Sequence, residues 1–386
     1  MKYAHVLTIM SHGKGGHVYD SVTIAEEINN SDGNDVELII IGRNISDVIK
    51  LSSVAYHFIP FNGFNFISVI FQLFHLIKSS DFEAINCFDN ESFSLIRVVS
   101  WFTKSQLFLT KCGGPNPLGY FPTHDNLIVF SQENKNFFEE ERSLDNVILI
   151  PNRIKCKEPD YKRITKLKEN IREDNIFLRV GRIHQHYKSS LIQTIEFVSD
   201  LYEKGYSVQL SLIGVVDDYE LLSELKLLDK FKIVDFIYEE DMTIDASTLI
   251  PFCDFYIGTG RGVMEGLSYG KVTLTNVCNF NVPIIVDKFN FKSFLGSNFS
   301  PRNKYIQKTS SFISVEDYLS YSANHADKYQ EEMLPLFNKY LNVQGVSKFY
   351  LDHYNNSRVF KYRFFDSVYS LFRTVLKVSI QSTKNV

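Results

Sequence analysis

Hydrophobic residues in segment 1–150 fall into short, nearly continuous runs that alternate with longer amphipathic stretches. Such runs are typical of parallel strands that are covered on both faces. The stretches between them repeat apolar residues at three- and four-residue steps, as in Val18, Val22, Ala25 and Ile28, which predicts helices that dock on a sheet. The predicted strands are 4–10, 36–41, 84–88, 107–110, 127–130 and 147–150.

A second alternating series follows the pair Pro151–Asn152 and the charged segment 155–174, which has little apolar content. Its predicted strands are 176–180, 208–213, 232–236, 255–257 and 272–276, with helices near 191–202 and 219–228. Strands that alternate with helices indicate an α/β fold with a parallel sheet. We therefore expect an α/β protein of two similar domains, with a boundary after Asn152, followed by aromatic and helical sequence near the C-terminus.

Composition supports two globular domains and excludes several other classes. The chain has 386 residues, 44% of them hydrophobic, which exceeds what one hydrophobic core usually supports. Because 41 Lys and Arg residues face 45 Asp and Glu residues, no overall field favours nucleic acid. Five scattered cysteines without metal-ligand spacing favour a reduced cytoplasmic compartment and no metal site. Since no stretch approaches the roughly 20 apolar residues of a membrane span, we expect no integral membrane segment.

A glycine-rich loop follows the first predicted strand and leads into the first helix. It contains Gly13, Lys14, Gly15 and Gly16, and it lacks the third glycine of the dinucleotide-binding pattern. A tight strand-to-helix turn explains it as well as a binding role does. In the binding interpretation, Gly15 and Gly16 allow a sugar or diphosphate to approach the backbone closely.

A basic loop follows the first strand of the second series. Gly181 and Arg182 end that strand, and Lys188 stands near the start of the next helix. Two cations on one loop can neutralise a diphosphate, although a solvated basic loop is the alternative. His184 and His186 lie between them, but the sequence suggests no third metal ligand.

A third loop, 258–262, follows the strand that ends at Ile257. Its sequence is Gly-Thr-Gly-Arg-Gly, and Glu265 is predicted in the first turn of the next helix. Either Glu265 stabilises the helix N-terminus, or it accepts hydrogen bonds from ribose hydroxyls while loop amides hold phosphate. The expected donor-binding residues come from these three loops and from the end of the predicted strand 208–213. They are Gly15, Gly16, Gly181, Gly214, Gly258, Thr259, Gly260, Arg261 and Gly262.

At these residues the sequence resembles the retaining GT-B glycosyltransferases, often called family four. The resemblance rests on Gly181, Arg182 and Lys188, on Gly214 after a strand, and on Glu265 with the turn 266–271. Pro151–Asn152 resembles the hinge before the second domain, and Gly15–Gly16 the first glycine loop; the likeness covers about residues 1–290. It implies two Rossmann-like domains facing a cleft, 1–152 for the acceptor and 153–345 for the donor, with helices in 346–386 packing back on the first.

The sequence departs from the family pattern at two positions. Eight residues before Glu265, where the family usually has a first Glu, stands Ile257. Contacts to the donor sugar would then come from loop amides, Thr259 or Arg261. Where the family often has a His after a strand of the first domain stands Cys112, and His17 is a possible substitute.

The resemblance implies sugar transfer with retention of configuration, without a metal or other cofactor, and the chain has no Asp-x-Asp motif. Arg182, Lys188 and Glu265 would be the catalytic residues, the cations stabilising the leaving diphosphate and Glu265 holding the ribose. A UDP-sugar is the expected donor. The acceptor, a saccharide or lipid-linked saccharide as in O-antigen, lipopolysaccharide or capsule assembly, would lie beside five residues of the first domain. They are His17, Lys111, Gly113, Gly114 and Asn116.

Segments 64–78 and 359–380 are rich in aromatic residues and could lie on the cytoplasmic face of the inner membrane. Core packing is the favoured explanation for the first segment, and both interpretations stay open for the second. Three rival functions remain: a GT-B sugar-nucleotide epimerase, a non-catalytic glycosyltransferase homologue, and an NAD-binding regulator or dehydrogenase. The missing Glu and His favour the second of these, and the absent dinucleotide fingerprint disfavours the third.

Overall fold

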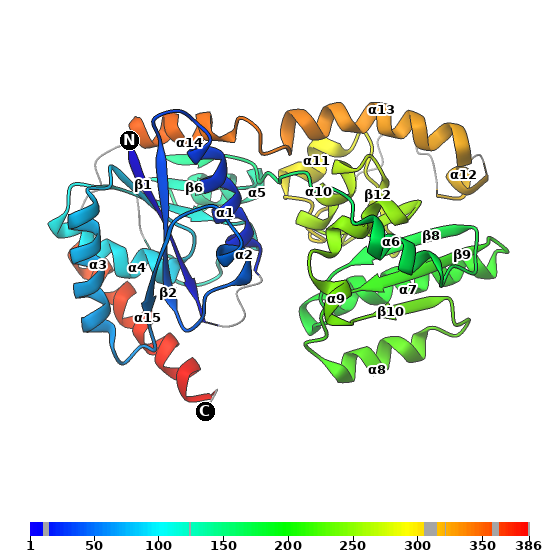
Figure 1. Ribbon diagram of the computed structural model, residues 1–386, viewed down its shortest axis with the longest axis horizontal. Coiled ribbons are helices and arrows are strands. Elements are labelled where there is room, and N and C mark those ends of the chain that lie inside the picture. Colours follow the sequence, from blue (N-terminus) through cyan, green and yellow to red (C-terminus); the bar gives the residue numbers. More distant parts are fainter. Residues whose placement is uncertain (11–14, 123–124, 305–314, 321, 357–362, 385–386) are drawn as a thin grey trace. The chain divides into compact units, whose positions relative to one another are not determined.

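The computed structural model describes residues 1–10, 15–122, 125–304, 315–320, 322–356 and 363–384 (Figure 1). The chain divides into two compact units, each with its own sheet. The first unit comprises Met1–Arg153 and Val343–Val386, and the second comprises Ile154–Asn342. The second unit thus ends slightly before the expected boundary at residue 345. The C-terminal helices belong to the first unit.

The first unit is built on a seven-stranded parallel sheet of order β3-β2-β1-β4-β5-β6-β7. One face packs against α1, α2 and α14, and the other against α3, α4 and α15. The strands are β1 (Lys2–Ile9), β2 (Asp35–Gly42), β3 (Tyr56–Pro60), β4 (Ala84–Cys87), β5 (Gln106–Lys111), β6 (Leu127–Val129) and β7 (Val147–Leu149). The helices are α1 (Gly16–Asn29), α2 (Asp47–Lys50), α3 (Phe66–Ser80), α4 (Asn90–Val99), η1 (Ser100–Phe102), α5 (Gln132–Asn136), η2 (Phe137–Glu141), α14 (Val346–Asn355) and α15 (Phe364–Lys384).

The second unit is built on a six-stranded sheet of order β10-β9-β8-β11-β12-β13, parallel except for β13. The strands are β8 (Asn175–Val180), β9 (Val208–Ile213), β10 (Val234–Ile237), β11 (Phe255–Gly258), β12 (Val272–Thr275) and β13 (Ile284–Ile285). The helices are α6 (Tyr161–Lys168), η3 (Gln185–Tyr187), α7 (Lys188–Glu203), α8 (Tyr219–Leu228), α9 (Glu240–Thr243), η4 (Ala246–Phe252), α10 (Arg261–Ser268), α11 (Phe291–Gly296), α12 (Val315–Ser320) and α13 (Ser322–Tyr340).

Both sheets confirm the predicted α/β class, and each predicted strand is present to within two residues at either end. Two strands were missed. β3 lies at the sheet edge and ends in Pro60, so it has an exposed, polar side and no continuous apolar run. β13 is only two residues long and antiparallel, which is too short to produce a pattern.

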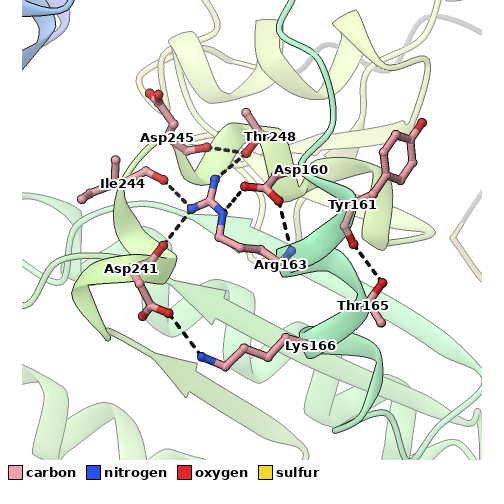
Figure 2. A network of polar contacts seen from close by, with 9 residues as sticks. All are labelled: Asp160, Tyr161, Arg163, Thr165, Lys166, Asp241, Ile244, Asp245 and Thr248. Atoms are coloured by element: carbon pink, nitrogen blue, oxygen red, sulfur yellow. Dashed lines mark hydrogen bonds and ion pairs between the residues drawn. The ribbon is translucent and has the colours of Figure 1, made fainter.

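The charged segment 155–174, expected to mark a domain boundary because of its low apolar content, is part of the second unit. Its helix α6 buries Ile164 and Leu167 in a hydrophobic cluster with α9 and η4. Arg163 fixes α6 in place, as Figure 2 shows: its guanidinium donates to Asp160 at 2.7 Å and to the carbonyl oxygen of Ile244 at 2.6 Å. It also donates to the Asp241 carbonyl at 2.9 Å. The charges therefore cap neighbouring helix ends instead of marking a flexible linker.

A buried polar network ties α14 to the first sheet. His5 on β1 lies 3.1 Å from both the Ser21 carbonyl oxygen and the hydroxyl of Tyr354 on α14. Asn86 donates to the same hydroxyl at 3.0 Å and accepts from Thr110 at 2.8 Å. Because His5 is fully enclosed, burial lowers its pKa to about 4. The imidazole is therefore neutral in the folded protein near neutral pH.

This burial predicts an acid-sensitive first unit. The folded pKa of His5 lies below its ordinary value of 6.5, so the unfolded chain takes up the proton first. The neutral His5 therefore contributes its full share to the free energy of unfolding above pH 6.5. That free energy falls by about 3 kcal/mol as the pH drops from 6.5 to about 4, because only the unfolded chain is protonated in this range. Urea unfolding followed by the fluorescence of Trp101, the single tryptophan, reports this unit. We expect His5→Gln to show a smaller loss of unfolding free energy over that pH range than the wild type; equal losses would contradict the assignment.

Candidate functional site

In both sheets the strand order reverses between two neighbouring strands, β1 and β4 in the first and β8 and β11 in the second. Open parallel sheets bind ligands at such switch points, beyond the carboxyl ends of the strands. The loops singled out in the sequence follow β1, β8 and β11. The topology therefore puts the expected site residues of each unit at the edge of the sheet where ligands collect.

Gly181 and Gly214, the residues that follow β8 and β9, touch through their backbones. A Cβ atom added to Gly214 would lie 1.7 Å from the carbonyl oxygen of Gly181. The two loops stay paired beyond this contact, because the Gly181 amide donates to the Ile213 carbonyl at 2.9 Å and Ile183 forms a parallel bridge with Val216. Around Gly181 itself, space for a Cβ is open within 4 Å. The backbone of Gly181 thus presents an uncovered side, and Gly214 is required by packing.

Both expected cations of this region form ion pairs, one with a carboxylate just before α8 and the other with a carboxylate in the middle of α8. Arg182 lies 3.6 Å from Asp217, and Lys188 lies 2.7 Å from Glu224. All four side chains are between 32% and 44% exposed. Pairs so accessible to water contribute at most about 1 kcal/mol. An anionic ligand can therefore displace the carboxylates at little cost.

Glu265 does not lie in the first turn of its helix, as the sequence had suggested. α10 begins at Arg261, so Glu265 is one turn further along. There its carboxylate accepts from Arg261 Nε at 3.1 Å, and both side chains are about one-fifth exposed. The simple explanation of Glu265 as a partner of the helix dipole is therefore wrong.

The glycines of segment 258–266 are explained largely by one aromatic ring. Tyr256, fully buried on β11, would lie 2.9 Å from a Cβ added to Gly258, 3.2 Å from one on Gly262 and 2.5 Å from one on Gly266. Gly260 adopts a φ of +56° as the residue before α10. Side chains at these positions would push α10 off the ring.

The backbone amides of this loop are partly used within the protein. The Gly260 amide donates to the Phe299 carbonyl at 2.8 Å, and the Gly262 amide to the Thr259 carbonyl at 3.1 Å. The expectation that both amides are exposed for phosphate is therefore wrong. The side chains of Thr259 and Arg261 remain, partly exposed, at the start of α10.

Sequence reasoning missed Arg179, a buried cation beneath the β8 loop. Its guanidinium donates to Ser190 Oγ at 2.7 Å, Thr194 Oγ1 at 2.7 Å and Asn276 Oδ1 at 2.9 Å. All of these acceptors are uncharged, and burial lowers the pKa of Arg179 to about 10. Its place within an apolar strand concealed it in the sequence. A buried positive charge here favours anions at the adjacent loop.

The first unit places Gly15, Gly16 and His17 at the start of α1, and Gly13 and Lys14 lie outside the described residues. A Cβ on Gly16 would meet open space, which fits an exposed backbone. Sequence reasoning also missed Asp89, which follows β4 and accepts from the Thr8 and Ser92 amides, each at 2.6 Å. Burial raises the pKa of this carboxyl, and Glu91 raises it further, while the charge of His17 opposes that rise.

The four remaining acceptor-side candidates form one network after β5. Lys111 Nζ donates to the carbonyl oxygens of Gly113 and Gly114, the latter at 3.3 Å. Both glycines have left-handed φ angles, +71° and +77°, which explains the Gly-Gly pair. Asn134, a buried residue missed in the sequence, donates to Asn116 Oδ1 at 2.8 Å and accepts from Lys111 at 3.4 Å. The network holds this loop in a fixed shape.

The two positions that depart from the family pattern carry no exposed functional group. Ile257 is fully buried on β11, within the main hydrophobic cluster of the second unit. Cys112 is partly buried, and burial raises the pKa of its thiol well above its usual range. Neither residue supplies the charge of the residue that it replaces.

The fold is similar to that of solved glycosyltransferases, each matched over 92% of this chain. Glycosyltransferase from Rickettsia africae has a TM-score of 0.68 at 16% identity over its full length. Anabaena HepE in complex with UDP and glucose has 0.62 at 11% identity over 99% of its length. The lipopolysaccharide outer core galactosyltransferase WaaB has 0.55 at 12% identity over 99%. No protein-family model and no curated protein matches the chain. These likenesses establish the GT-B fold, with two Rossmann-like units.

The glycine contact predicts different outcomes for two alanine substitutions. Gly214→Ala forces a methyl group against the Gly181 carbonyl, so the second unit should lose about 1–3 kcal/mol of unfolding free energy. Gly181→Ala places its methyl group in open space and should change stability by less than about 0.5 kcal/mol. Differential scanning calorimetry measures both. A Gly214→Ala protein as stable as the wild type would show that the two loops are not in contact.

Proposed function

We propose that the chain is a glycosyltransferase that moves a sugar from a nucleotide-sugar to a saccharide or lipid-linked saccharide. One observation carries this proposal. The backbone of Gly181 has an uncovered side next to Arg182 and Lys188, at the switch point of the second sheet. The GT-B fold supports it, since two of the solved structures that share the fold are a glycosyltransferase and a galactosyltransferase by name.

UDP is the nucleotide that we propose for the donor. HepE, which shares the fold, was solved with UDP and with UDP-glucose. In this chain a diphosphate at the open side of Gly181 would replace Asp217 and Glu224 as the partner of Arg182 and Lys188. Buried Arg179 would add a positive potential from below. The Glu265 carboxylate would bind the ribose hydroxyls in place of its present partner, Arg261.

The proposed reaction needs charge stabilisation more than proton transfer at the donor. The acceptor hydroxyl oxygen forms a bond to the anomeric carbon while the bond to the diphosphate oxygen breaks and UDP leaves with the electron pair. The hydroxyl proton passes to the departing phosphate. Attack on the face from which UDP departs retains the configuration, and Arg182 and Lys188 stabilise the charge that develops. We propose that no metal takes part, because the sequence has no Asp-x-Asp motif.

The proposed acceptor site is the first-unit loop set of His17, Lys111, Gly113, Gly114 and Asn116. The rigid network around Asn134 supports this assignment, because saccharide hydroxyls need fixed donors and acceptors. A lipid-linked acceptor would place the enzyme at the cytoplasmic face of the inner membrane. In the described part of the chain, no helix combines the length and the hydrophobicity needed to cross a bilayer.

A non-catalytic homologue is the second candidate. The burial of Ile257, where the family usually has Glu, favours it, because the sugar end of the donor site then lacks that carboxylate. The two candidates differ in turnover and not in UDP binding. Incubating the protein with UDP-glucose, UDP-galactose or UDP-N-acetylglucosamine and lipid-linked or free saccharides, and measuring UDP release, separates them. Acceptor-dependent release supports the enzyme; UDP binding without release by any pair would assign the homologue.

The ion pairs at the donor loop predict opposite effects of removing cations and carboxylates. Arg182→Ala and Lys188→Ala should each weaken UDP binding about 10- to 100-fold and remove most transfer, since each loses a charge-assisted contact to phosphate. Glu224→Gln should bind UDP at least as tightly as the wild type, because it removes a competing anion. Isothermal titration calorimetry measures all three. Lys204→Ala, which breaks an exposed pair with Glu316 in the same unit, is the control; cation variants that bind like it would refute the phosphate assignment.

A further inference from the structure

Helix α15 largely reverses the usual arrangement of polar and apolar faces, although Val378 and Leu371 pack into the core of the first unit. Small polar residues, Ser367, Ser370 and Thr374, are buried against the protein. Large apolar residues recur at helical spacing on the outer face and are 46–86% exposed: Phe365, Val368, Tyr369, Phe372, Leu376 and Ile380. A helix that folds only onto its own domain shows the opposite arrangement. The outward stripe therefore has no apolar partner within the described part of the first unit.

Polar contacts on the inner face hold α15 in this orientation. Arg97 of α4, fully buried, pairs with Asp366 at 2.6 Å, and Tyr120 donates to the same carboxylate at 2.8 Å. Gly63 packs so closely on Ser379 that a Cβ would lie 2.3 Å from the Ser379 hydroxyl. A rotation of α15 that buried the stripe would break these contacts. The reversed pattern is thus fixed by specific interactions.

The exposed stripe continues onto α3 through aromatic contacts. Trp101 of η1 stacks on Phe364 with ring centroids 5.3 Å apart, and Phe102 meets Phe74 of α3 edge to face at 6.3 Å. On α3, Ile67 and Phe71 are about 60% exposed, although Val69, Leu73 and Ile77 are buried. Core packing thus explains only half of α3. Figure 1 shows α3, α4 and α15 along one side of the first unit, where α4 contacts both of the others.

Cations border this α15–α3 surface. Lys78, Lys104, Arg363, Arg373 and Lys377 are exposed on it. Arg373 lies over the rings of Tyr120 and Tyr369, at 5.3 and 5.7 Å. The acidic groups nearby are Asp366 and Glu91, which pair with Arg97 and Lys377, and Asp81 at the end of α3. The surface is locally positive although the chain carries a net charge of −4.

A groove of about 570 Å³ runs beside the apolar stripe. Its walls include the cations Arg373 and Lys377 and the apolar side chains Leu376 and Ile380, together with the Glu91 carboxylate that pairs with Lys377. A phospholipid presents the same combination, an anionic headgroup next to hydrocarbon. The groove thus offers room for headgroups where the stripe would meet acyl chains.

We propose that the α15–α3 surface docks on an anionic lipid bilayer, with the aromatic stripe at the level of the headgroups and the cations against lipid phosphates. A second copy of the chain fits less well. A second copy would present the same excess of cations, whereas an anionic surface complements them. This docking deepens the proposed function by bringing the first unit to a lipid-linked acceptor, but it needs no transferase activity.

Flotation with vesicles tests the docking in the absence of donor and acceptor. The wild type should float with vesicles of phosphatidylcholine and phosphatidylglycerol in equal parts and much less with phosphatidylcholine alone. The double substitution Phe372→Glu with Leu376→Glu should reduce vesicle binding at least about tenfold, because it puts two charges into the apolar stripe. It should leave the fold intact, because both side chains are exposed. Leu51→Glu with Leu227→Glu, which changes two exposed leucines outside the surface, is the matched control and should float like the wild type. Arg363→Gln should weaken binding to the charged vesicles about fivefold.

Trp101 supplies a second readout that a structural defect would not mimic, because it lies within the surface. Brominated lipid should quench its fluorescence in the wild type and not in the α15 double variant. The proposal is overturned if the wild type fails to float with charged vesicles, or if the control variant loses binding equally. A combined result of two other measurements also overturns it. In that result, ultracentrifugation shows a dimer that the double variant Phe372→Glu with Leu376→Glu no longer forms, and brominated vesicles do not quench Trp101. UDP binding, measured in parallel, tests the proposed function separately.

Discussion

The backbone contact between Gly181 and Gly214 constrains the whole candidate site of the second unit. Because Gly214 carries no Cβ at the contact, the chain segments after β8 and β9 stay paired as far as Ile183 and Val216. This pairing fixes where Arg182 leaves the sheet and where α7 begins. The exposed side of Gly181 is the other consequence. One steric requirement thus links the architecture of the sheet to the surface that we propose for the diphosphate.

Charge at this site is arranged so that an anion can enter. Arg182, Lys188 and Glu265 each have a partner of opposite sign, and the pairs of Arg182 and Lys188 are weak because water reaches them. Arg179 differs, because it is buried and its hydrogen-bond acceptors among the described residues are all neutral. The surface cations are neutralised by carboxylates when the site is empty, and a phosphate can replace those carboxylates. The buried charge of Arg179 below them adds to the attraction for phosphate.

Much of the fold could be predicted from the sequence, because strands covered on both faces leave continuous apolar runs. The edge strand β3 and the two-residue β13 could not, since neither is covered in that way. The site was predicted where loops carry glycines and charges. Residues of the candidate site were missed where they lie in an apolar strand, as with Arg179, or in a short polar helix away from the glycine loops, as with Asn134. Pairing partners such as Glu224 come from distant segments, which no local pattern reveals.

Glycines misled sequence reasoning in one respect. Segment 258–266 suggested amides open to phosphate, whereas the ring of Tyr256 explains Gly258, Gly262 and Gly266 by packing. For helix α15 the sequence left both interpretations open, because its amphipathic pattern is clear but which face is buried depends on Arg97 and Gly63. Local pattern and global packing disagree there, which natural proteins tolerate chiefly at functional surfaces.

The central claim is that the second unit binds the diphosphate of a nucleotide-sugar at the open side of Gly181. A crystal structure of the protein soaked with UDP tests it most directly. The account predicts diphosphate density within hydrogen-bond distance of the Gly181–Arg182 backbone and of Lys188, with Glu224 displaced and the ribose beside Glu265. Nucleotide density elsewhere in the molecule, or UDP that leaves the Lys188–Glu224 pair intact, would contradict it.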